Sequence, residues 1–185
     1  MIFKAIEFAA RAHSGQYRKG TKIPYIVHPL GVAKILIEYG CPEHLIVAGI
    51  LHDTVEDTPV TLDEIKQSFG WHVADLVEAA SEPDKSDTWE NRKNHTIAMV
   101  TILSDEAVVL VLADKLDNIR AIRADYERYG EDLWQRFNRP REKQKWYYEG
   151  LSIIFTDRLS DEQSRNLLGI FKSEVALVFG DDFSP

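Results

Sequence analysis

The chain has 185 residues, of which 44% are hydrophobic and 28% are charged, and this composition is typical of a globular domain. Its formal net charge of −8 argues against a general nucleic-acid-binding protein, because such proteins need a basic surface. The single cysteine, Cys41, excludes internal disulfides and fits a reducing compartment. The charged N-terminal segment is not typical of a signal peptide, and no run of about 18 apolar residues could span a membrane. We expect a cytoplasmic protein with one domain over residues 1–185.

Apolar residues recur at helical spacing along nearly the whole chain, and turn residues separate the segments. Gly40 ends one helix, Pro42 begins the next, and residues 61–64 (Thr-Leu-Asp-Glu) have the pattern of a capping box. Outside residues 42–58, the predicted helices cover residues 2–12, 29–39, 61–69, 71–80, 89–103, 104–122, 141–155 and 161–179, the last preceded by a cap at 160–163. Residues 81–88 form the most polar segment, which we interpret as a loop.

Residues 107–113 (Ala-Val-Val-Leu-Val-Leu-Ala) are compatible with a buried strand or a helix, since β-branched runs are ambiguous. A serine start at Ser104 and the helical pattern that continues to Ile122 favour one long helix. On that helix, Asp114 shares an apolar stripe with Leu110 and Asn118. We therefore predict an all-α, single-domain protein in which the Asp114 carboxylate points inward.

The central stretch, residues 48–58, joins an apolar helix to the ionisable side chains of His52, Asp53, Glu56 and Asp57. On the helix begun at Pro42, His52 and Asp53 lie on the apolar stripe, where a buried charge is costly unless it is paired or binds a cation. If the helix continues for one more turn, Glu56 lies below His52 and Asp57 below Asp53. Three carboxylates so close repel by about 4 kcal/mol per pair at about 4 Å. A divalent cation would hold them together; the alternative is an exposed acidic helix end.

His28 begins another predicted inner helix, and it completes a set with His52, Asp53 and Asp114. Two imidazoles and two carboxylates suit Mn²⁺, Fe²⁺ or Zn²⁺ better than Ca²⁺. Four protein ligands on an octahedral ion leave two positions for water and substrate, as a hydrolytic site requires. Each residue alone is more often a hydrogen-bonded core residue, but the adjacency of His52 and Asp53 favours a metal site.

A short basic patch precedes His28. Arg18, Lys19 and Lys22 stand close together in an acidic chain, and they indicate either a solvated turn or a contact with a phosphorylated substrate. Asn118, one turn past Asp114, is placed to hydrogen-bond a substrate.

Other polar and aromatic residues receive structural interpretations. A solvated helix face is the favoured interpretation of Arg92 and Lys93, and core packing that of residues 146–148 (Trp-Tyr-Tyr). Cys41 stands in a turn between helices. No partner is spaced for the remaining histidines, which we assign to structure or surface: His13, His44, His72 and His95.

The joined motifs resemble a known family. His28, His52-Asp53 and Asp114 match the metal signature of the HD-domain phosphohydrolases. Longer segments resemble the hydrolase domain of RelA/SpoT proteins, and most closely its stand-alone form, the small alarmone hydrolases and the metazoan SpoT homologue: Arg18-Lys19, residues 24–29 (Pro-Tyr-Ile-Val-His-Pro), residues 51–58 (Leu-His-Asp-Thr-Val-Glu-Asp-Thr) and residues 112–118 (Leu-Ala-Asp-Lys-Leu-Asp-Asn). The motif core covers about residues 2–122, with C-terminal helices at 140–179 packing on it.

The resemblance implies an HD-domain helical bundle with one Mn²⁺ ion, which hydrolyses the 3′-pyrophosphate of (p)ppGpp to pyrophosphate and GDP or GTP. It implies Glu56 and Asp57 as the acid/base pair, and Arg18, Lys19 and Asn118 as nucleotide contacts. The alternatives are another nucleotide phosphohydrolase, acting on NADPH or a nucleoside monophosphate, and a non-catalytic nucleotide sensor.

Three positions depart from the family pattern. Lys115 stands where arginine is frequent, Asp117 where aromatic or histidine residues occur, and Ala121 where the long Rel enzymes commonly have threonine. These positions bear on the fit of the substrate and not on the predicted metal ligands.

Overall fold

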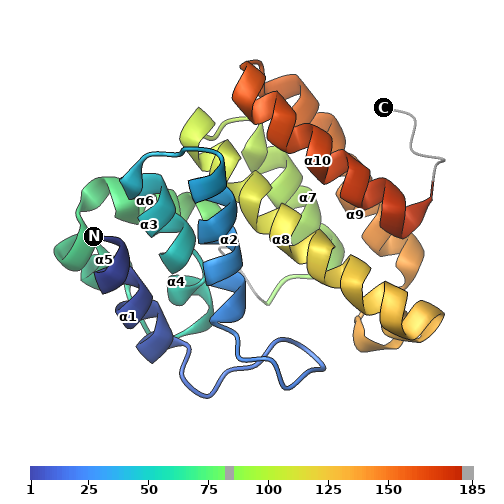
Figure 1. Cartoon of the computed structure of the whole chain (residues 1–185), viewed down its shortest axis with the longest axis horizontal. Coiled ribbons are helices and arrows are strands. Elements are labelled where there is room, and N and C mark those ends of the chain that lie inside the picture. Colours follow the sequence, from blue (N-terminus) through green and yellow to red (C-terminus); the bar gives the residue numbers. More distant parts are fainter. Residues whose placement is uncertain (82–85, 181–185) are drawn as a thin grey trace.

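The computed structural model describes residues 1–81 and 86–180, and within these residues it contains helices and one isolated β-bridge, Tyr17 with Pro24 (Figure 1). The predicted all-α, single-domain fold is confirmed. No helix in these two described segments is both long and apolar enough to cross a membrane. The elements are α1 (Ile2–Ala12), α2 (Val27–Glu38), α3 (Glu43–Leu51), α4 (Thr54–Asp57), α5 (Leu62–Phe69), α6 (Trp71–Ala80), α7 (Trp89–Val100), α8 (Asp105–Tyr129), the 3₁₀ helix η1 (Gly130–Arg136), α9 (Arg141–Arg158) and α10 (Glu162–Phe179).

The long helix α8 organises the bundle. It packs against α2, α3 and α6 on the N-terminal side and against α9 and α10 on the other, and Figure 1 shows it in yellow between these two groups. Its helical form over residues 107–113 excludes the strand alternative, and the Ser104 side chain caps it by accepting a hydrogen bond from the Ala107 amide, 3.3 Å away. α8 therefore offers both groups of helices a buried face, which includes Asp114.

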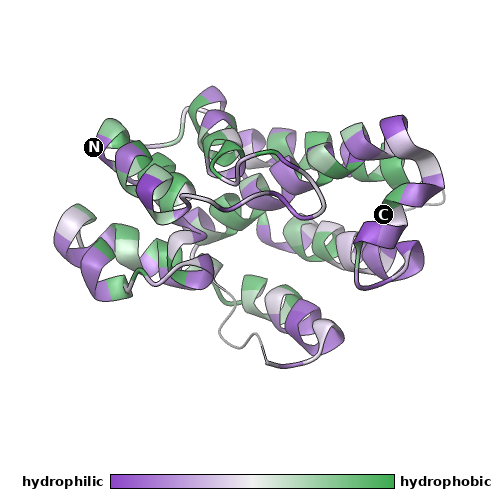
Figure 2. Cartoon of the chain, turned by 90° about the horizontal axis from the view of Figure 1, so that it is seen from below, coloured by the Kyte–Doolittle hydropathy of each residue, from purple (hydrophilic) through white to green (hydrophobic). Residues whose placement is uncertain are grey.

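Helix α3 is buried on every side, from Leu45 through Leu51. It contacts α1, α2, α6 and α8, so each of its faces meets another helix. A Cβ atom at Gly49 would lie 2.6 Å from Leu36 Cδ1, so the absence of a side chain there lets α2 approach closely. Figure 2 shows the hydrophobic faces of the helices turned toward one another and the hydrophilic faces turned outward. This packing holds the end of α3 firmly, and His52 lies at that end.

The central helix does not continue through Asp57. α3 ends at Leu51, and after His52 and Asp53 the four-residue helix α4 begins at Thr54. Side chains interrupt the ladder: His52 Nδ1 lies 2.8 Å from the Gly49 carbonyl, and the Thr54 hydroxyl donates to the Leu51 carbonyl at 2.6 Å. The condition under which Glu56 and Asp57 would lie directly below His52 and Asp53, one helix continuing for a further turn, is therefore not met.

Other boundaries differ by small amounts. The predicted capping box at Thr61 and Glu64 is confirmed. The cap of α10 is Asp161, whose side chain accepts from the Ser164 amide, so the predicted serine cap one residue earlier is wrong. α7 ends at Val100, α9 continues to Arg158, and η1 was not predicted. Residues 82–85 of the predicted loop lie outside the described residues.

Candidate metal centre and adjoining cavities

His28 enters the centre from the first turn of α2. Its side chain is buried, and its Nδ1 lies 2.6 Å from Oδ2 of Asp117 on α8. A carboxylate accepts the hydrogen bond, so Nδ1 carries the hydrogen and Nε2 presents a lone pair. That Nε2 lies 3.1 Å from Asp114 Oδ1 and 3.5 Å from Asp53 Oδ2. One side of the imidazole is thus fixed by α8, and the other faces two carboxylates.

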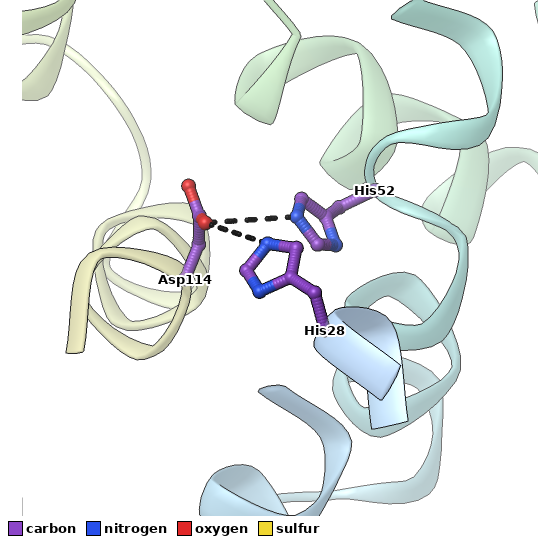
Figure 3. Close-up of side chains that lie close together, drawn as sticks. All are labelled: His28, His52 and Asp114. Carbon is purple, nitrogen blue, oxygen red and sulfur yellow. Dashed lines mark ion pairs between the residues drawn. The ribbon is translucent and has the colours of Figure 1, made fainter. Parts of the chain in front are cut away.

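His52 enters from the end of α3, and its tautomer is fixed in the same way. Its Nδ1–H donates to the Gly49 carbonyl at 2.8 Å, which leaves the lone pair on Nε2. Nε2 is buried and has no hydrogen-bond partner among the described residues, although Asp53 Oδ2 lies 3.1 Å away and Asp114 Oδ1 3.7 Å away. Figure 3 shows His28 and His52 both directed at Asp114.

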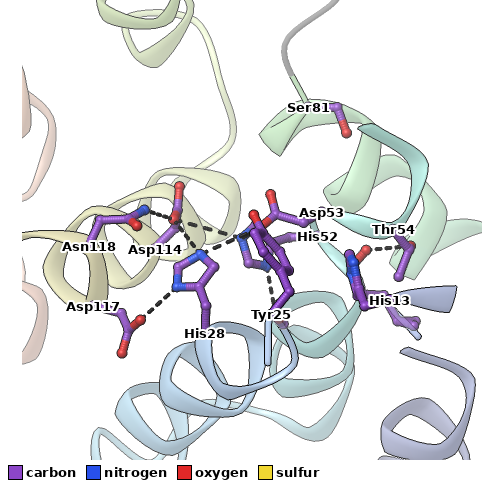
Figure 4. A network of polar contacts seen from close by, with 12 residues as sticks. His13, Tyr25, His28, His52, Asp53, Thr54, Ser81, Asp114, Asp117 and Asn118 are labelled. Carbon is purple, nitrogen blue, oxygen red and sulfur yellow. Dashed lines mark hydrogen bonds and ion pairs between the residues drawn. The ribbon is translucent and has the colours of Figure 1, made fainter. Parts of the chain in front are cut away.

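Each of the two carboxylates is also held by a neighbour. The Tyr25 hydroxyl donates to Asp53 Oδ2 at 2.7 Å. Asn118 Nδ2 donates to Asp114 Oδ1 at 2.6 Å, and Lys115 Nζ lies 2.6 Å from Asp114 Oδ2. Figure 4 shows Tyr25, Asp53, Asp114 and Asn118 arranged around the two imidazoles. The oxygens that face the imidazoles, Asp53 Oδ2 and Asp114 Oδ1, are therefore each held in position by one hydrogen bond.

The arrangement fits a divalent cation. Donor atoms of His28, His52 and Asp114 lie within 4.8 Å of one another, and Asp53 Oδ2 faces both imidazoles. Lone pairs on two buried nitrogens that face carboxylate oxygens need a positive charge between them, either a proton or a metal ion. Mixed nitrogen and oxygen donors are ordinary ligands of first-row divalent metals.

Without a metal ion, the negative charge of the neighbouring carboxylates favours the protonated forms of His28 and His52. Burial alone would lower the pKa of His28 and of His52, but the neighbouring carboxylates outweigh burial and raise both values above the ordinary one. Burial likewise would raise the pKa of Asp53 and of Asp114; the imidazoles, and for Asp114 the Lys115 ammonium, hold both below the ordinary value. The carboxylates are therefore ionised and attract a cation.

The predicted acid/base residues share a cavity with the centre. A cavity of about 530 Å³ has His28, Asp53 and Asp114 in its wall, together with Glu56 and Asp57 from α4. Both α4 carboxylates are half-buried. Although the helix breaks after Leu51, the structure thus brings these two carboxylates to the same cavity as the metal-binding cluster.

A second cavity, of about 540 Å³, adjoins the first. The two have five lining residues in common: Tyr25, Arg92, Lys93, Lys115 and Asn118. The second cavity is also lined by Arg18 and Lys19. Four aromatic side chains complete its wall: Trp89 of α7, Phe137 directly after η1, and Tyr147 and Tyr148 of α9. The first cavity is thus rich in ionisable groups beside the metal centre and the second combines basic and aromatic side chains, a combination suited to the phosphates and the base of a nucleotide.

The predicted substrate contacts Arg18, Lys19 and Asn118 all line the second cavity, and Asn118 lines the first as well. Arg18 Nη2 donates to Asn118 Oδ1 at 2.7 Å, and its guanidinium lies 5.7 Å from the centre of the Tyr25 ring. Lys19 Nζ donates to Asn138 Oδ1 at 3.0 Å. Because Asn118 also bonds Asp114, a chain of hydrogen bonds runs from Arg18 to the metal centre.

Several residues at the site were not predicted there. Lys93 and Arg92 line both cavities, so the solvated-face interpretation of this pair is wrong. Lys115 and Asp117 were noted only as departures from a family pattern, yet they contact Asp114 and His28. A usable signal was present, because Asp117 lies three residues from Asp114 on α8 and so near it on the helix surface.

Comparison with known proteins agrees with the motifs. The model of a family described as an HD domain matches residues 5–142. The chain is 41% identical over 140 residues to the human protein named guanosine-3′,5′-bis(diphosphate) 3′-pyrophosphohydrolase MESH1, which covers 74% of this chain and 78% of that one. An Aquifex aeolicus protein named guanosine-3′,5′-bis(diphosphate) 3′-pyrophosphohydrolase is 42% identical over 125 residues. The aligned residues make up 65% of this chain but only 18% of the Aquifex protein.

Two solved structures resemble this one along most of their length. A Listeria monocytogenes protein, lmo0812, has a TM-score of 0.76 and 38% identity, over 84% of this chain and 96% of that one. A metazoan ortholog of SpoT, described as hydrolysing ppGpp, has a TM-score of 0.74 and 28% identity, over 93% of this chain and 94% of that one. The resemblance carried by the motifs is confirmed.

Proposed function

This chain belongs to the HD domain family, and from that membership and the geometry of its site we propose that it is a metal-dependent (p)ppGpp 3′-pyrophosphohydrolase. The reaction adds water across the bond between the 3′ oxygen and phosphorus, and releases pyrophosphate and GDP or GTP. The names of the human and Aquifex relatives support this choice of substrate. We also propose that the hydrolase domain includes α9 and α10, since α9 supplies Tyr147 and Tyr148 to the second cavity.

One observation carries the proposal. The buried, unpartnered Nε2 of His52 faces two carboxylates beside a cavity that continues into a basic and aromatic one. Such a buried atom is costly unless a cation or proton satisfies it. The first cavity therefore suits a charged, metal-assisted step, and the second suits the rest of a nucleotide.

We propose His28, His52, Asp53 and Asp114 as the ligands and Mn²⁺ as the ion, because mixed imidazole and carboxylate ligands fit that metal. When bound, such an ion polarises a phosphoryl oxygen and lowers the pKa of a coordinated water. Tyr25, Lys115 and Asn118 would keep the carboxylates oriented through the contacts described above.

The remaining chemistry falls to other residues of this chain. We propose that Glu56 and Asp57, which line the first cavity, accept and return the proton of the attacking water. Lys93, Lys115 and Arg92 line the junction of the cavities, where cationic groups would neutralise phosphate oxygens.

Arg18, Lys19 and Asn118 are proposed to hold the nucleoside portion. Arg18 is suited to stacking on a base as well as to binding phosphate, because its planar guanidinium does both. Its bond to Asn118 places it beside the passage between the cavities.

Product analysis tests the proposal. The Mn²⁺-loaded protein is incubated in H₂¹⁸O with ppGpp, NADPH and a panel of nucleoside monophosphates. The expected products of ppGpp are GDP and pyrophosphate, with the ¹⁸O in pyrophosphate because water attacks phosphorus and the P–O3′ bond breaks. The Asp53→Ala variant, prepared in parallel, should be inactive.

The alternatives give different results. Release of inorganic phosphate from NADPH or from a nucleoside monophosphate, with ppGpp unchanged, would indicate another nucleotide phosphohydrolase. Tight binding of ppGpp without any turnover by the metal-loaded protein would indicate a sensor. Either result would overturn the proposed activity.

A further inference from the structure

A second cluster of metal-binding side chains lies away from the cavities just described. His44, His72 and Glu106 come from α3, α6 and α8, and each is the second residue of its helix. His44 and His52 are eight residues apart, which places them about 12 Å apart along the helix axis. The three helices that build the core thus bring their first turns together at this cluster.

One carboxylate joins the two imidazoles. Glu106 Oε1 lies 2.6 Å from His44 Nε2, and Oε2 lies 2.9 Å from His72 Nε2. The two imidazole rings stack, with centres 4.4 Å apart and planes at 28°. Since both Nε2 atoms meet the same carboxylate, they lie on the same side of the stacked pair. Donor atoms of all three residues lie within 4.8 Å of one another.

Partial burial alone would raise the pKa of the Glu106 carboxyl, but the hydrogen bonds from His44 and His72 outweigh burial and lower it, so the carboxylate is ionised. The positive ends of three helix dipoles lie at the cluster. The same dipoles stabilise the carboxylate of Glu106. Because an ionised carboxylate only accepts, each Nε2 carries the hydrogen in the present arrangement, and coordination through Nε2 requires that hydrogen to leave or to move to Nδ1.

We propose that His44, His72 and Glu106 form a second metal site, which binds a zinc-like divalent transition metal and ties together the first turns of α3, α6 and α8. Metal–ligand bonds of about 2.0–2.2 Å place tetrahedral ligand atoms about 3.3 Å apart. The present separations of 2.6 and 2.9 Å need to widen by less than 1 Å. The side chains are 30%, 47% and 39% exposed for His44, His72 and Glu106, so there is room to move and access from solvent.

Charge and coordination complete the argument. The carboxylates of Glu43 and Asp105 stand in the first turns of α3 and α8 and reduce the positive potential of these helix ends, although Glu43 pairs with the Met1 ammonium and Asp105 with Arg158. Two imidazoles and one carboxylate leave a fourth tetrahedral position for water. The site is independent of the proposed hydrolase activity.

The structure contains its own reporter. Trp71 is 65% exposed, and its ring stacks on His72, with centres 5.6 Å apart and planes at 25°. A metal on His72 changes the environment of this indole. Co²⁺ serves as a probe as well, because a tetrahedral cobalt site absorbs visible light.

Metal stoichiometry tests the proposal on the full chain. Protein stripped with a chelator is titrated with Zn²⁺ against a competing indicator, and tryptophan emission is followed in parallel in Trp71→Phe, which keeps the other three tryptophans and identifies the part due to Trp71. We expect two equivalents for the unmodified chain and one for His44→Ala, His72→Ala and Asp53→Ala. Emission should change with the second equivalent in the unmodified chain and with the single equivalent in Asp53→Ala, but it should not change in His44→Ala or His72→Ala.

Controls separate metal binding from folding. Glu106→Gln preserves the shape of the side chain and can still bond an imidazole, so it should keep the melting temperature of the metal-free chain and lose the second equivalent. His95→Ala removes an exposed histidine that lines the first cavity but belongs to neither cluster, and this variant should keep both equivalents. A single equivalent in the unmodified chain, or a second equivalent that persists in His44→Ala and Glu106→Gln, would overturn the proposal.

Discussion

Asp117 on α8 holds His28 on α2 through a contact of 2.6 Å between Oδ2 and Nδ1. The two helices approach so closely here that a Cβ atom on Gly31 would lie 2.1 Å from Asp117 Oδ1. The glycine therefore makes room for the carboxylate, and the carboxylate turns the lone pair of His28 toward Asp53 and Asp114. Carboxylate–histidine pairs of this kind orient metal-ligating imidazoles and increase their basicity.

Replacing Asp117 should weaken the metal centre without removing a ligand. We expect Asp117→Ala to lower metal affinity by about 10- to 100-fold, as is typical for partners of ligating histidines. Asp117→Asn should recover part of this loss, because its carbonyl oxygen still accepts from Nδ1–H. Competition with a chelator of known affinity measures both variants.

Two further variants make the Asp117 test specific. Gly31→Ala should also lower metal affinity, because the added methyl group displaces the Asp117 carboxylate. Glu127→Gln alters an exposed carboxylate on the same helix and should have no effect. Equal metal affinity for Asp117→Ala and the unmodified chain would mean that this contact has no role in orienting His28.

The stability that the centre gives to the folded chain should fall with rising pH when no metal is bound and should rise with pH when a metal is bound. His28 and His52 have raised pKa values in the folded, metal-free chain, whereas the unfolded value is about 6.5. Their contribution to stability is thus fully present below about pH 6.5 and is lost as pH rises through the folded pKa values. Mn²⁺ needs deprotonated imidazoles, so its stabilising effect should grow as pH rises.

Melting temperatures with chelator and with Mn²⁺, measured between pH 6 and 9, check this expectation. The Glu106→Gln variant is the suitable background, because only the buried centre then binds metal. The gap between the two melting curves should widen with pH, and protons should be released on binding. A gap that stays constant over the range would show that the imidazoles are already neutral in the metal-free chain.

The basic residues before α2 should act in binding. Arg18→Ala and Lys19→Ala remove one charge each from the second cavity and one hydrogen bond each, to Asn118 and Asn138. We expect a higher KM with kcat little changed, because these contacts form in both the bound substrate and the transition state. The melting temperature should fall by only a few degrees, since a typical hydrogen bond contributes about 1 kcal/mol.

Lys22→Ala is the matched control, because Lys22 is an exposed basic residue of the same segment. Its KM should equal that of the unmodified chain. If Arg18→Ala instead lost much stability and kept its KM, the segment would be a structural turn.

The sequence predicted correctly which side chains of a single helix point into the core, because helical periodicity alone determines this. On α8, the spacing of Leu110, Asp114 and Asn118 is a property of one helix, and it correctly indicated that Asp114 points into the core. The apolar surroundings of His52 gave a similar indication. These inferences need only local geometry, which a helical pattern determines.

Contacts between segments that are distant in the sequence could not be predicted from helical periodicity. Asp117 contacts His28 only because α2 packs against α8. The two residues are 89 positions apart in the sequence, so no local pattern indicates the contact. His44, His72 and Glu106 likewise have no common spacing and meet only because three helices converge. The break after Leu51 was missed because local side-chain bonds, from His52 and Thr54, compete with the helix ladder.

Glu56 and Asp57 should carry rate rather than metal affinity. They line the first cavity from α4, whereas the four proposed ligands meet at the buried centre. General acid–base catalysis contributes about 10² to 10⁴-fold. We therefore expect Glu56→Gln and Asp57→Asn each to lower kcat within that range while metal content stays constant, and a bound metal should still raise the melting temperature.

The ligand variants provide the contrast. Asp53→Ala and His52→Ala should empty the buried centre, and the carboxylates that remain then repel one another without a cation to offset them. Metal content, kcat and melting temperature measured on the same preparations separate the two roles. Because the helix breaks between His52 and Thr54, the α4 carboxylates are oriented separately from those of the ligands. Should Asp57→Asn lose its metal as completely as Asp53→Ala does, Asp57 coordinates the ion directly and the division of roles is wrong.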